Sequence, residues 1–304
     1  MGTLWVLITG GEPLLREDFF DIYIMLKKKG LLVSVFTNAC LVTQAHIDLF
    51  KQYPPRDIEV SVYGASRETY EEVTRKPGSY ALFRRGLDLL LNSGVKVRMK
   101  AMALRSNINE LPEIAHFCRQ YTCDYFRFDP LLHLRYDGDQ KRNVEIKLER
   151  LSPEEIVAIE QADEERSANL QKNCNELIQP ENELTACNHL FHCGAGQGSF
   201  SVSYDGYFRL CSTLHHPQSL YDLRKGTLAQ AWNEFTLQVR DLRSSDQKFL
   251  ETCRVCPIVN LCLWCPANAY LECGQMDGWS EYFCQVAHAR EEAIKNQARP
   301  IGLT

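Results

Sequence analysis

The sequence predicts an α/β protein in which a partial parallel (β/α) barrel is followed by a smaller cysteine-rich domain. Two observations predict this organisation. Over residues 1–131, short apolar runs alternate strictly with segments of helical periodicity, which is typical of βα units that build a parallel sheet or barrel. From about residue 183 the pattern changes, and nine of the thirteen cysteines fall between Cys187 and Cys284.

Five short apolar runs in the first half of the chain predict the strands of the sheet. Their expected ranges are Leu4–Thr9, Leu32–Thr37, Ile58–Tyr63, Val95–Ala103 and Tyr125–Asp129. Helical patterns separate successive strands, at Arg16–Lys29, Thr43–Gln52, Ala81–Ser93 and Glu110–Tyr121. Because ligands of such folds bind at the carboxyl ends of the strands, residues that directly follow a strand are the first candidates for a binding site.

Residues 132–182 are polar, charged and poor in strand signals, so we expect a helical bridge or linker there. The run SPEE at 152–155 predicts a helix start, with Ser as the cap, Pro at the first position and Glu at the third. The charged helix that it begins is expected to reach about Gln171.

The cysteine-rich domain is expected over residues 183–286, interrupted by a helical stretch at Leu228–Arg243. The last segment, residues 287–304, is expected to form a C-terminal helix and tail, and the helical pattern itself runs from about Val286 to Asn296.

Composition excludes several classes of protein. No run approaches the roughly 18 apolar residues of a membrane span, and the N-terminus lacks the zones of a signal peptide. The net charge of -5 and the pI near 5.9 argue against broad electrostatic binding to nucleic acid. We therefore expect a cytoplasmic protein with neither membrane nor nucleic acid as a partner, in which reduced cysteines hold metal instead of forming disulfides.

The cysteines of the second half form three blocks. They are Cys187-x5-Cys193 with the string Gly206-x4-Cys211, then Cys253-x2-Cys256-x5-Cys262-x2-Cys265, and finally Cys284, with Cys273 between the last two blocks. A CxxC turn lets two thiolates reach one site, and four thiolates complete a zinc site or an iron–sulfur cluster. A hairpin turn at Tyr204-Asp205-Gly206 is expected to bring Cys193 and Cys211 to the ends of neighbouring strands. Zinc remains the alternative to iron, and the histidines that could complete zinc sites are His189, His192, His215 and His216.

This cysteine pattern resembles the SPASM domain of radical S-adenosylmethionine (SAM) enzymes, which carries two auxiliary [4Fe-4S] clusters. The resemblance assigns Cys187, Cys193, Cys211 and Cys265 to the first auxiliary cluster. It assigns Cys253, Cys256, Cys262 and Cys284 to the second. The family usually has three residues between the last two cysteines of the central block, whereas two separate Cys262 from Cys265 here, so Cys273 stays open as a substitute ligand for Cys265.

The first predicted strand runs directly into Gly10-Gly11-Glu12-Pro13. Adjacent glycines let a ligand approach the backbone closely, and Glu12 offers a carboxylate to an ammonium group. The run GGEP resembles the motif that holds the amino group of SAM in radical SAM enzymes.

Two further strand ends carry the same resemblance. Thr37-Asn38 resembles the TNG signature of the family with Ala39 in place of the glycine, and Ser61 in SVYG falls where such enzymes usually show SLDG and hold the ribose of SAM. Thr74, with Arg75 beside it, lies about thirteen residues after Ser61, at the position where enzymes of this family often have an arginine.

The resemblance extends from about Leu4 to about Arg290, but the chain contains no CxxxCxxC, the triplet that binds the catalytic cluster of the family. Only nine residues precede Gly10, so the first βα unit of the barrel is missing from this sequence, and a strand at residue 4 would leave one sheet edge uncovered. We expect an N-terminally truncated chain or gene model, and the alternative is a natural variant without the catalytic cluster.

The resemblance implies an oxidoreductase that modifies a peptide or protein by hydrogen abstraction with a 5′-deoxyadenosyl radical, while the auxiliary clusters handle electrons or substrate. It implies SAM, two auxiliary [4Fe-4S] clusters, a third, catalytic cluster in the intact protein only, and a reductant such as a flavodoxin or ferredoxin. The chain by itself is expected to be inactive, and its catalytic residues are not identified. Two alternatives remain, namely an iron–sulfur peptide-binding or electron-transfer protein without radical chemistry, and a zinc-stabilised interaction module.

Overall fold

The structure is a computed structural model that describes residues 2–122, 127–172, 178 and 187–297. The chain divides into two compact units. Unit 1 comprises Met1–Leu132 and Leu148–Arg150, and unit 2 comprises His133–Lys147 and Leu151–Thr304. No helix among the described residues is both long and apolar enough to cross a membrane.

Unit 1 is built on a five-stranded sheet in the order β1-β2-β3-β4-β5, and every neighbouring pair is parallel. The strands are β1 Trp5–Ile8, β2 Leu32–Thr37, β3 Asp57–Val62, β4 Val97–Met102 and β5 Arg127–Asp129. The predicted parallel α/β sheet is therefore confirmed. The first two residues of the last predicted strand, 125 and 126, lie outside the described residues.

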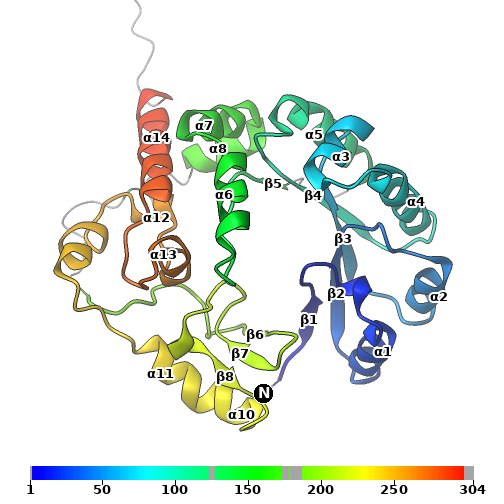
Figure 1. Cartoon of the computed structure of the whole chain (residues 1–304), viewed down its shortest axis with the longest axis horizontal. Coiled ribbons are helices and arrows are strands. Elements are labelled where there is room, and N and C mark those ends of the chain that lie inside the picture. Colours follow the sequence, from blue (N-terminus) through cyan, green and yellow to red (C-terminus); the bar gives the residue numbers. More distant parts are fainter. Residues whose placement is uncertain (1, 123–126, 173–177, 179–186, 298–304) are drawn as a thin grey trace, which may run out of the picture. The chain divides into compact units, whose positions relative to one another are not determined.

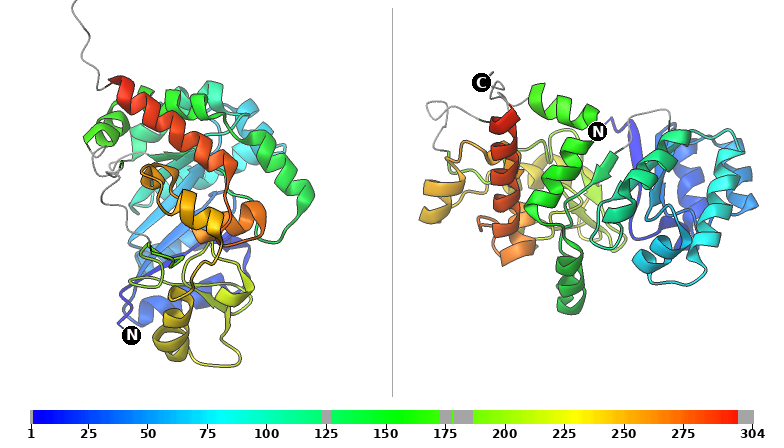
Figure 2. Two further views of the ribbon diagram at one scale, coloured as in Figure 1. Left: turned by 90° about the vertical axis from the view of Figure 1, so that its left-hand side faces the viewer. Right: turned by 90° about the horizontal axis from the view of Figure 1, so that it is seen from above.

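The predicted helices of unit 1 are all present, and they cover the same face of the sheet (Figures 1 and 2). They are α1 Phe19–Lys28, α2 Gln44–Gln52, α4 Ser79–Leu91 and α5 Leu111–Tyr121. One helix was not predicted, α3 Arg67–Thr74, whose N-terminus is capped by Ser66 Oγ accepting from Thr69 N at 3.2 Å. Half of its residues are charged, and the fully buried Tyr70 anchors it.

The two faces of this sheet differ in chemistry. The helix-covered face is apolar and almost completely buried, for example at Val35 and Val60. On the opposite face, Glu59 lies in register with Arg98 on β4, and Lys100 Nζ is 3.0 Å from Glu59 Oε1. Because register partners of parallel strands point to the same side, this face presents charges along several strands. The prediction of uniformly buried strands therefore holds for one face only, and the charged face is suited to line a polar site.

Unit 2 contains a three-stranded antiparallel sheet and many short helices (Figure 1). Its strands are β6 Ser201–Val202, β7 Tyr207–Arg209 and β8 Tyr221–Asp222. The predicted turn joins β6 to β7, and Gly206 has the positive φ of +83° that favours glycine. An apolar core that includes Phe208, Leu210 and Leu214 packs against this sheet.

The helices of unit 2 are shorter and less regular than those of unit 1. They are α6 Gln140–Glu149, α7 Pro153–Ala162, α8 Glu164–Lys172, α10 Leu228–Gln230, the π-helix η5 Ala231–Phe235, α11 Thr236–Arg240, the π-helix η6 Phe249–Cys253, α12 Val259–Cys262, α13 Pro266–Cys273 and α14 Glu281–Gln297. The helical stretch predicted at 228–243 is present as a continuous helical segment that ends three residues early. The C-terminal helix is present and begins five residues earlier than predicted, so that Cys284 lies in its first turn.

The predicted cap at Ser152 is confirmed as a capping box with Glu155. The helix does not continue unbroken to Gln171, because Asp163 adopts an extended conformation and starts α8 by accepting from Arg166 N at 2.9 Å. The remaining residues of the predicted bridge, 173–177 and 179–182, lie outside the described residues.

A buried ion pair joins α7 to α14. Arg290 donates from Nη2 to Glu160 Oε1 at 2.7 Å and from Nε to Glu160 Oε2 at 3.0 Å, and the two residues are only 8% and 2% exposed. Its third donor, Nη1, reaches the backbone oxygen of Leu261 on α12 at 3.0 Å. Arg290 thereby joins α7 to α12 and α14, the two helices that carry Cys262 and Cys284.

Candidate functional site

The carboxyl ends of β1 and β2 are joined through the side chain of Glu12. Glu12 Oε1 accepts hydrogen bonds from Thr37 Oγ1 at 2.8 Å and from Leu14 N at 3.1 Å, and Oε2 accepts from Asn38 N at 2.7 Å. The structure thus brings together the GGEP and TN runs, which are separated by about 25 residues of sequence. Oε2 retains capacity for a second donor, since a carboxylate oxygen accepts more than one hydrogen bond.

The backbone around this carboxylate is specialised. Gly10 and Gly11 are exposed, and Gly10 has a φ of +147°, a conformation that side chains rarely allow. Ala39 lies in the left-handed region at φ +61° and is fully buried, and its amide donates to Thr37 Oγ1 at 3.0 Å. Helix α4 approaches this turn so closely that a Cβ on Gly86 would lie 1.9 Å from Ala39 O. Gly86 is therefore required by the turn that holds the TN pair.

Ser61 lies half-buried on β3, in register with Lys100 on the charged face of the sheet. The next residue on the same face, Tyr63, is packed inward, and burial raises the pKa of its hydroxyl. Thr74 does not face a ligand, because its Oγ1 bonds to Tyr70 O at 2.9 Å and to Ser79 Oγ at 2.7 Å.

Two polar residues at the same edge were not predicted from the sequence. Asn107 is 1% exposed, and its Nδ2 donates to both Tyr63 O and Met102 O at 3.0 Å. Glu110 accepts from the amides of Ala65 and Ser66, and although burial by itself would raise the pKa of Glu110, these hydrogen bonds lower it. Their position just after β4 was the available signal, because polar residues that follow a strand lie at this edge.

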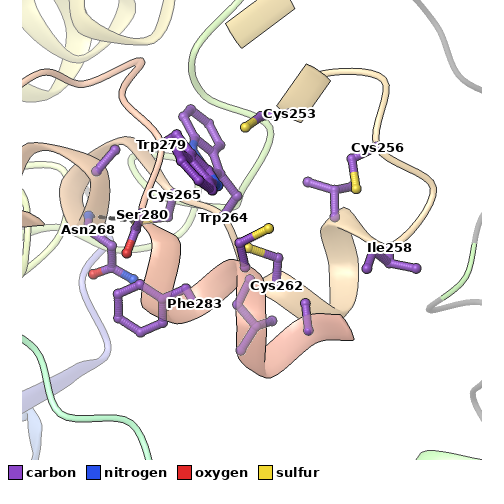
Figure 3. Close-up of a pocket in the computed structure, with 15 residues that line it drawn as sticks. Cys253, Cys256, Ile258, Cys262, Trp264, Cys265, Asn268, Trp279, Ser280 and Phe283 are labelled. Carbon is purple, nitrogen blue, oxygen red and sulfur yellow. Dashed lines mark hydrogen bonds between the residues drawn. The ribbon is translucent and has the colours of Figure 1, made fainter. Parts of the chain in front are cut away.

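In unit 2, five cysteines line one pocket, whose empty space of about 490 Å³ includes open solvent. One of the five is Cys265, which is described below, and the other four come from separate elements. They are Cys253 at the end of η6, Cys256 in the following turn, Cys262 at the end of α12, and Cys284 in the first turn of α14. Figure 3 shows the labelled Cys253, Cys256 and Cys262 arranged around a common space, beside the indole rings of Trp264 and Trp279. Four separate elements thus deliver one thiol each.

The thiols of this group influence each other. Burial, together with the neighbouring thiols of Cys284, Cys253 and Cys256, raises the pKa of Cys262 to about 12. Burial also raises the pKa of Cys253 and of Cys256, with Cys284 adding to both shifts. Without a cation the group resists ionisation, whereas iron neutralises the thiolates that bind it. Four thiols in a largely apolar pocket therefore fit the ligand set of a [4Fe-4S] cluster.

A second group of thiols is smaller. Burial raises the pKa of Cys265, the N-cap of α13, and the thiols of Cys211 and Cys193 add to the shift, so these three lie close together. Cys193 and Cys211 are therefore near each other as predicted, although neither lies within a strand. Cys273 lies elsewhere, exposed at the end of α13, with its Sγ 3.0 Å from Ala269 O.

Cys187 is held differently from the other thiols. Its Sγ lies 3.1 Å from His189 Nδ1, and His189 Nε2 lies 3.1 Å from Asp241 Oδ1. Hydrogen bonds from the backbone and ring of His189 lower the pKa of Cys187. The same bond to Cys187, together with the one to Asp241, raises the pKa of His189.

Two of the other histidines near the cysteines, His215 and His216, have aromatic partners. The ring of His215 stacks on Tyr136 with centroids 3.8 Å apart, and His216 meets Tyr270 edge-on at 4.8 Å. Within the described residues, no three side chains of His, Cys, Asp or Glu lie close enough together to hold a single metal ion.

Two family models match this chain, one in each unit. Residues 2–118 match the family model of the radical SAM superfamily, and residues 193–257 match that of the SPASM iron–sulfur cluster-binding domain. Together the two matches cover more than half of the chain.

Individual relatives are distant. An AdoMet-dependent heme synthase of Nitratidesulfovibrio vulgaris is 22% identical over 120 residues, which are 40% of this chain and 33% of the relative. The antilisterial bacteriocin subtilosin biosynthesis protein AlbA of Bacillus subtilis is 23% identical over 278 residues, covering 87% of this chain and 57% of that protein. The chain thus spans less than two thirds of either relative.

Among solved structures, Streptococcus suis SuiB bound to its precursor peptide SuiA superposes with a TM-score of 0.64 at 16% identity, covering 92% of this chain and 65% of SuiB. At that identity the likeness establishes the fold, which agrees with both family matches. The chain therefore contains a radical SAM superfamily domain over residues 2–118 and a SPASM iron–sulfur cluster-binding domain over residues 193–257.

Proposed function

We propose that this chain is the SAM-binding and auxiliary-cluster part of an oxidoreductase that modifies a peptide or protein. The observation that carries the proposal is the convergence of Cys253, Cys256, Cys262 and Cys284 on one pocket of the SPASM-containing unit. A peptide substrate is supported by two of the similar proteins, since AlbA is named for bacteriocin biosynthesis and SuiB was solved with a precursor peptide.

In this proposal the carboxyl edge of unit 1 binds SAM. Glu12 Oε2 accepts a hydrogen bond from the ammonium group of the methionine moiety of SAM. Thr37 and Asn38 hold the carboxylate of Glu12 in place by hydrogen bonds. Exposed Gly10 and Gly11 let the ligand lie against the backbone, and Pro13, buried at the first position of a 3-10 turn, fixes the direction of the chain. Ser61 is assigned to the ribose.

The thiols are assigned to two auxiliary [4Fe-4S] clusters. Cys253, Cys256, Cys262 and Cys284 bind one of them. Cys193, Cys211 and Cys265 bind the other, and Cys187 becomes its fourth ligand by exchanging its hydrogen bond to His189 for iron. Bound SAM and a reduced catalytic cluster supply the 5′-deoxyadenosyl radical that abstracts hydrogen in this family, and the auxiliary clusters handle electrons or substrate.

Because the sequence contains no CxxxCxxC, we assign no catalytic cluster to these residues, and they do not split SAM by themselves. The intact enzyme takes electrons from a reductant such as a flavodoxin or ferredoxin. The described cysteines are all free thiols, and thiols that bind iron must stay reduced, which fits a cytoplasmic protein.

The SAM site is tested by calorimetric titration of SAM into the anaerobically reconstituted chain. Glu12→Gln keeps the shape of the side chain but removes the charge, so the affinity should fall by about 10–100-fold, the equivalent of roughly 1.5–3 kcal/mol for a hydrogen bond to a charged group. Glu17→Gln, on an exposed carboxylate five residues away, is the matched control and should leave the affinity unchanged. Equal affinity in both variants would remove Glu12 from the site.

The substrate class is tested with the same protein. Fluorescence-detected binding of short precursor peptides encoded beside the gene is compared with binding of an iron porphyrin, because several relatives are named as heme synthases, one of them aligned over 88% of this chain. Saturable peptide binding without porphyrin binding is expected. Binding of the porphyrin alone would contradict the peptide assignment while leaving the SAM site and the clusters intact.

A further inference from the structure

Arg254 directly follows Cys253 and is held in place from several sides. Its amide closes the π-helix η6 by donating to Phe249 O at 2.9 Å. Its guanidinium carbon lies 4.9 Å from the ring centroid of Phe249 and 5.5 Å from that of Trp264. Two aromatic contacts of this kind restrain a cation that would otherwise extend into solvent.

The polar contacts of this guanidinium are incomplete. Nη2 donates to the backbone oxygen of His189, which belongs to the segment that carries Cys187. Nε is buried and has no hydrogen-bond partner among the described residues. A partly buried cation with a free donor is electrostatically costly unless negative charge lies close by.

The negative charge available to Arg254 comes from two cysteines. Arg254 directly follows Cys253, and its Nη2 donates to the backbone oxygen of His189, whose Nδ1 lies 3.1 Å from Cys187 Sγ. An arginine remains charged in such surroundings. Under the cysteine assignment above, Cys187 and Cys253 belong to different clusters, and Arg254 stands between them.

We infer that Arg254 is a positioning residue that raises the reduction potential of the auxiliary clusters. The inference rests on the proposed function. A cluster gains one negative charge when it accepts an electron, and a fixed cation in a medium of low dielectric constant stabilises that charge. Charge and hydrogen bonding around the sulfurs are what set such potentials in proteins.

Three variants separate the charge from the shape of the side chain. Arg254→Met keeps an apolar stem between the two rings and removes the charge, Arg254→Gln removes the charge and keeps a donor, and Arg254→Lys keeps the charge. Arg224→Gln is the matched control, because Arg224 is an exposed arginine of the same unit that pairs with Asp222 and has no cysteine among its charged neighbours.

The measurement is a potentiometric titration of the anaerobically reconstituted full chain, followed by electron paramagnetic resonance, with iron content determined on the same samples. At a potential near the wild-type midpoint, the ratio of reduced to oxidised cluster should fall about tenfold in Arg254→Met and Arg254→Gln, a shift of roughly 59 mV for a one-electron couple. Arg254→Lys and Arg224→Gln should titrate near wild type.

Unchanged ratios in the iron-loaded Met and Gln variants would overturn the inference. If the Met and Gln variants lose iron, Arg254→Lys distinguishes the two roles. Wild-type iron content and reduction potential in Arg254→Lys would support the role of the charge. Loss of iron in Arg254→Lys would assign Arg254 a structural role only. Wild-type protein that binds no iron would instead contradict the proposed function, which is a separate outcome.

Discussion

The carboxyl edge of the parallel sheet and the cysteine pocket of unit 2 hold their functional side chains in different ways. At the sheet edge, Glu12, Thr37 and Asn38 are fixed by hydrogen bonds to one another, so the geometry exists before any ligand arrives. In the pocket, thiols such as Cys253 and Cys262 come from short helices and turns and oppose each other's ionisation. The edge is therefore preorganised by the protein, whereas the pocket gains stability from the metal that it binds.

The largest effect is expected from Cys262→Ser in the pocket. This change removes one ligand of the second cluster, so iron should fall from about eight to about four atoms per chain, and the thermal unfolding of unit 2 should shift to lower temperature. Iron analysis and circular dichroism measure the two effects. Cys273→Ser is the control, because that exposed thiol points to Ala269 O, and it should keep all of its iron. Iron loss in the control would instead identify Cys273 as a ligand.

The next largest effect is expected at the ion pair behind the pocket. Arg290→Met leaves the buried Glu160 with Arg166 as its one remaining cationic partner, at 2.8 Å from Oε1, so the free energy of unfolding should fall by about 1.5–3 kcal/mol. Urea titration of the iron-loaded chain measures the loss. Lys295→Met breaks an exposed pair with Glu291 on the same helix and should cost at most about 0.5 kcal/mol. An equal loss of unfolding free energy in the two variants would mean that the buried pair of Arg290 and Glu160 stabilises the fold no more than an exposed pair does.

A smaller effect is expected at the sheet edge from Gly86→Ala. The new Cβ would collide with Ala39 O, so the turn that carries Thr37 and Asn38 must move, at a cost of roughly 1–3 kcal/mol. Thermal unfolding should record the loss, and calorimetry should record weaker binding of SAM. Gly198→Ala adds a Cβ in open space and provides the reference. Wild-type SAM affinity in Gly86→Ala would show that the edge adapts to its ligand and is not preorganised.

The smallest effect is expected from Ala39→Gly. Ala39 occupies the left-handed region at φ +61°, where glycine is not strained, so the substitution should stabilise the native turn by up to about 1 kcal/mol, partly offset by the greater freedom of glycine in the unfolded chain. Chemical denaturation measures the change in the free energy of unfolding, and titration with SAM measures whether the affinity of the edge changes with it. A clear loss of stability would indicate that packing of the buried methyl group outweighs the backbone strain.

The regular parts of this fold could be predicted from the sequence because local patterns determine them. Alternation of apolar runs and helical periodicity located all five strands, and the SPEE run located the cap of α7. Helix α3 escaped because half of its residues are charged and a single buried tyrosine, Tyr70, anchors it.

The contacts that complete the candidate sites could not be predicted in the same way. Glu160 and Arg290 are 130 residues apart, and nothing local marks either as a buried partner of the other. The cysteine spacing indicated metal binding, but the grouping of Cys265 with Cys193 and Cys211 came from the family resemblance alone, because it depends on how α13 begins. The position of Arg254 between two thiols depends in turn on the rings of Phe249 and Trp264.

The most direct measurement is the metal content and absorption spectrum of the full chain after anaerobic reconstitution with iron and sulfide. Two [4Fe-4S] clusters predict about eight iron atoms per chain and a broad absorbance near roughly 400 nm. The iron content and the absorbance should both be lower when Cys256 or Cys193 is replaced. About one or two zinc ions without iron would contradict the assignment of the thiols to clusters, and would make unit 2 a zinc-stabilised module without a redox role.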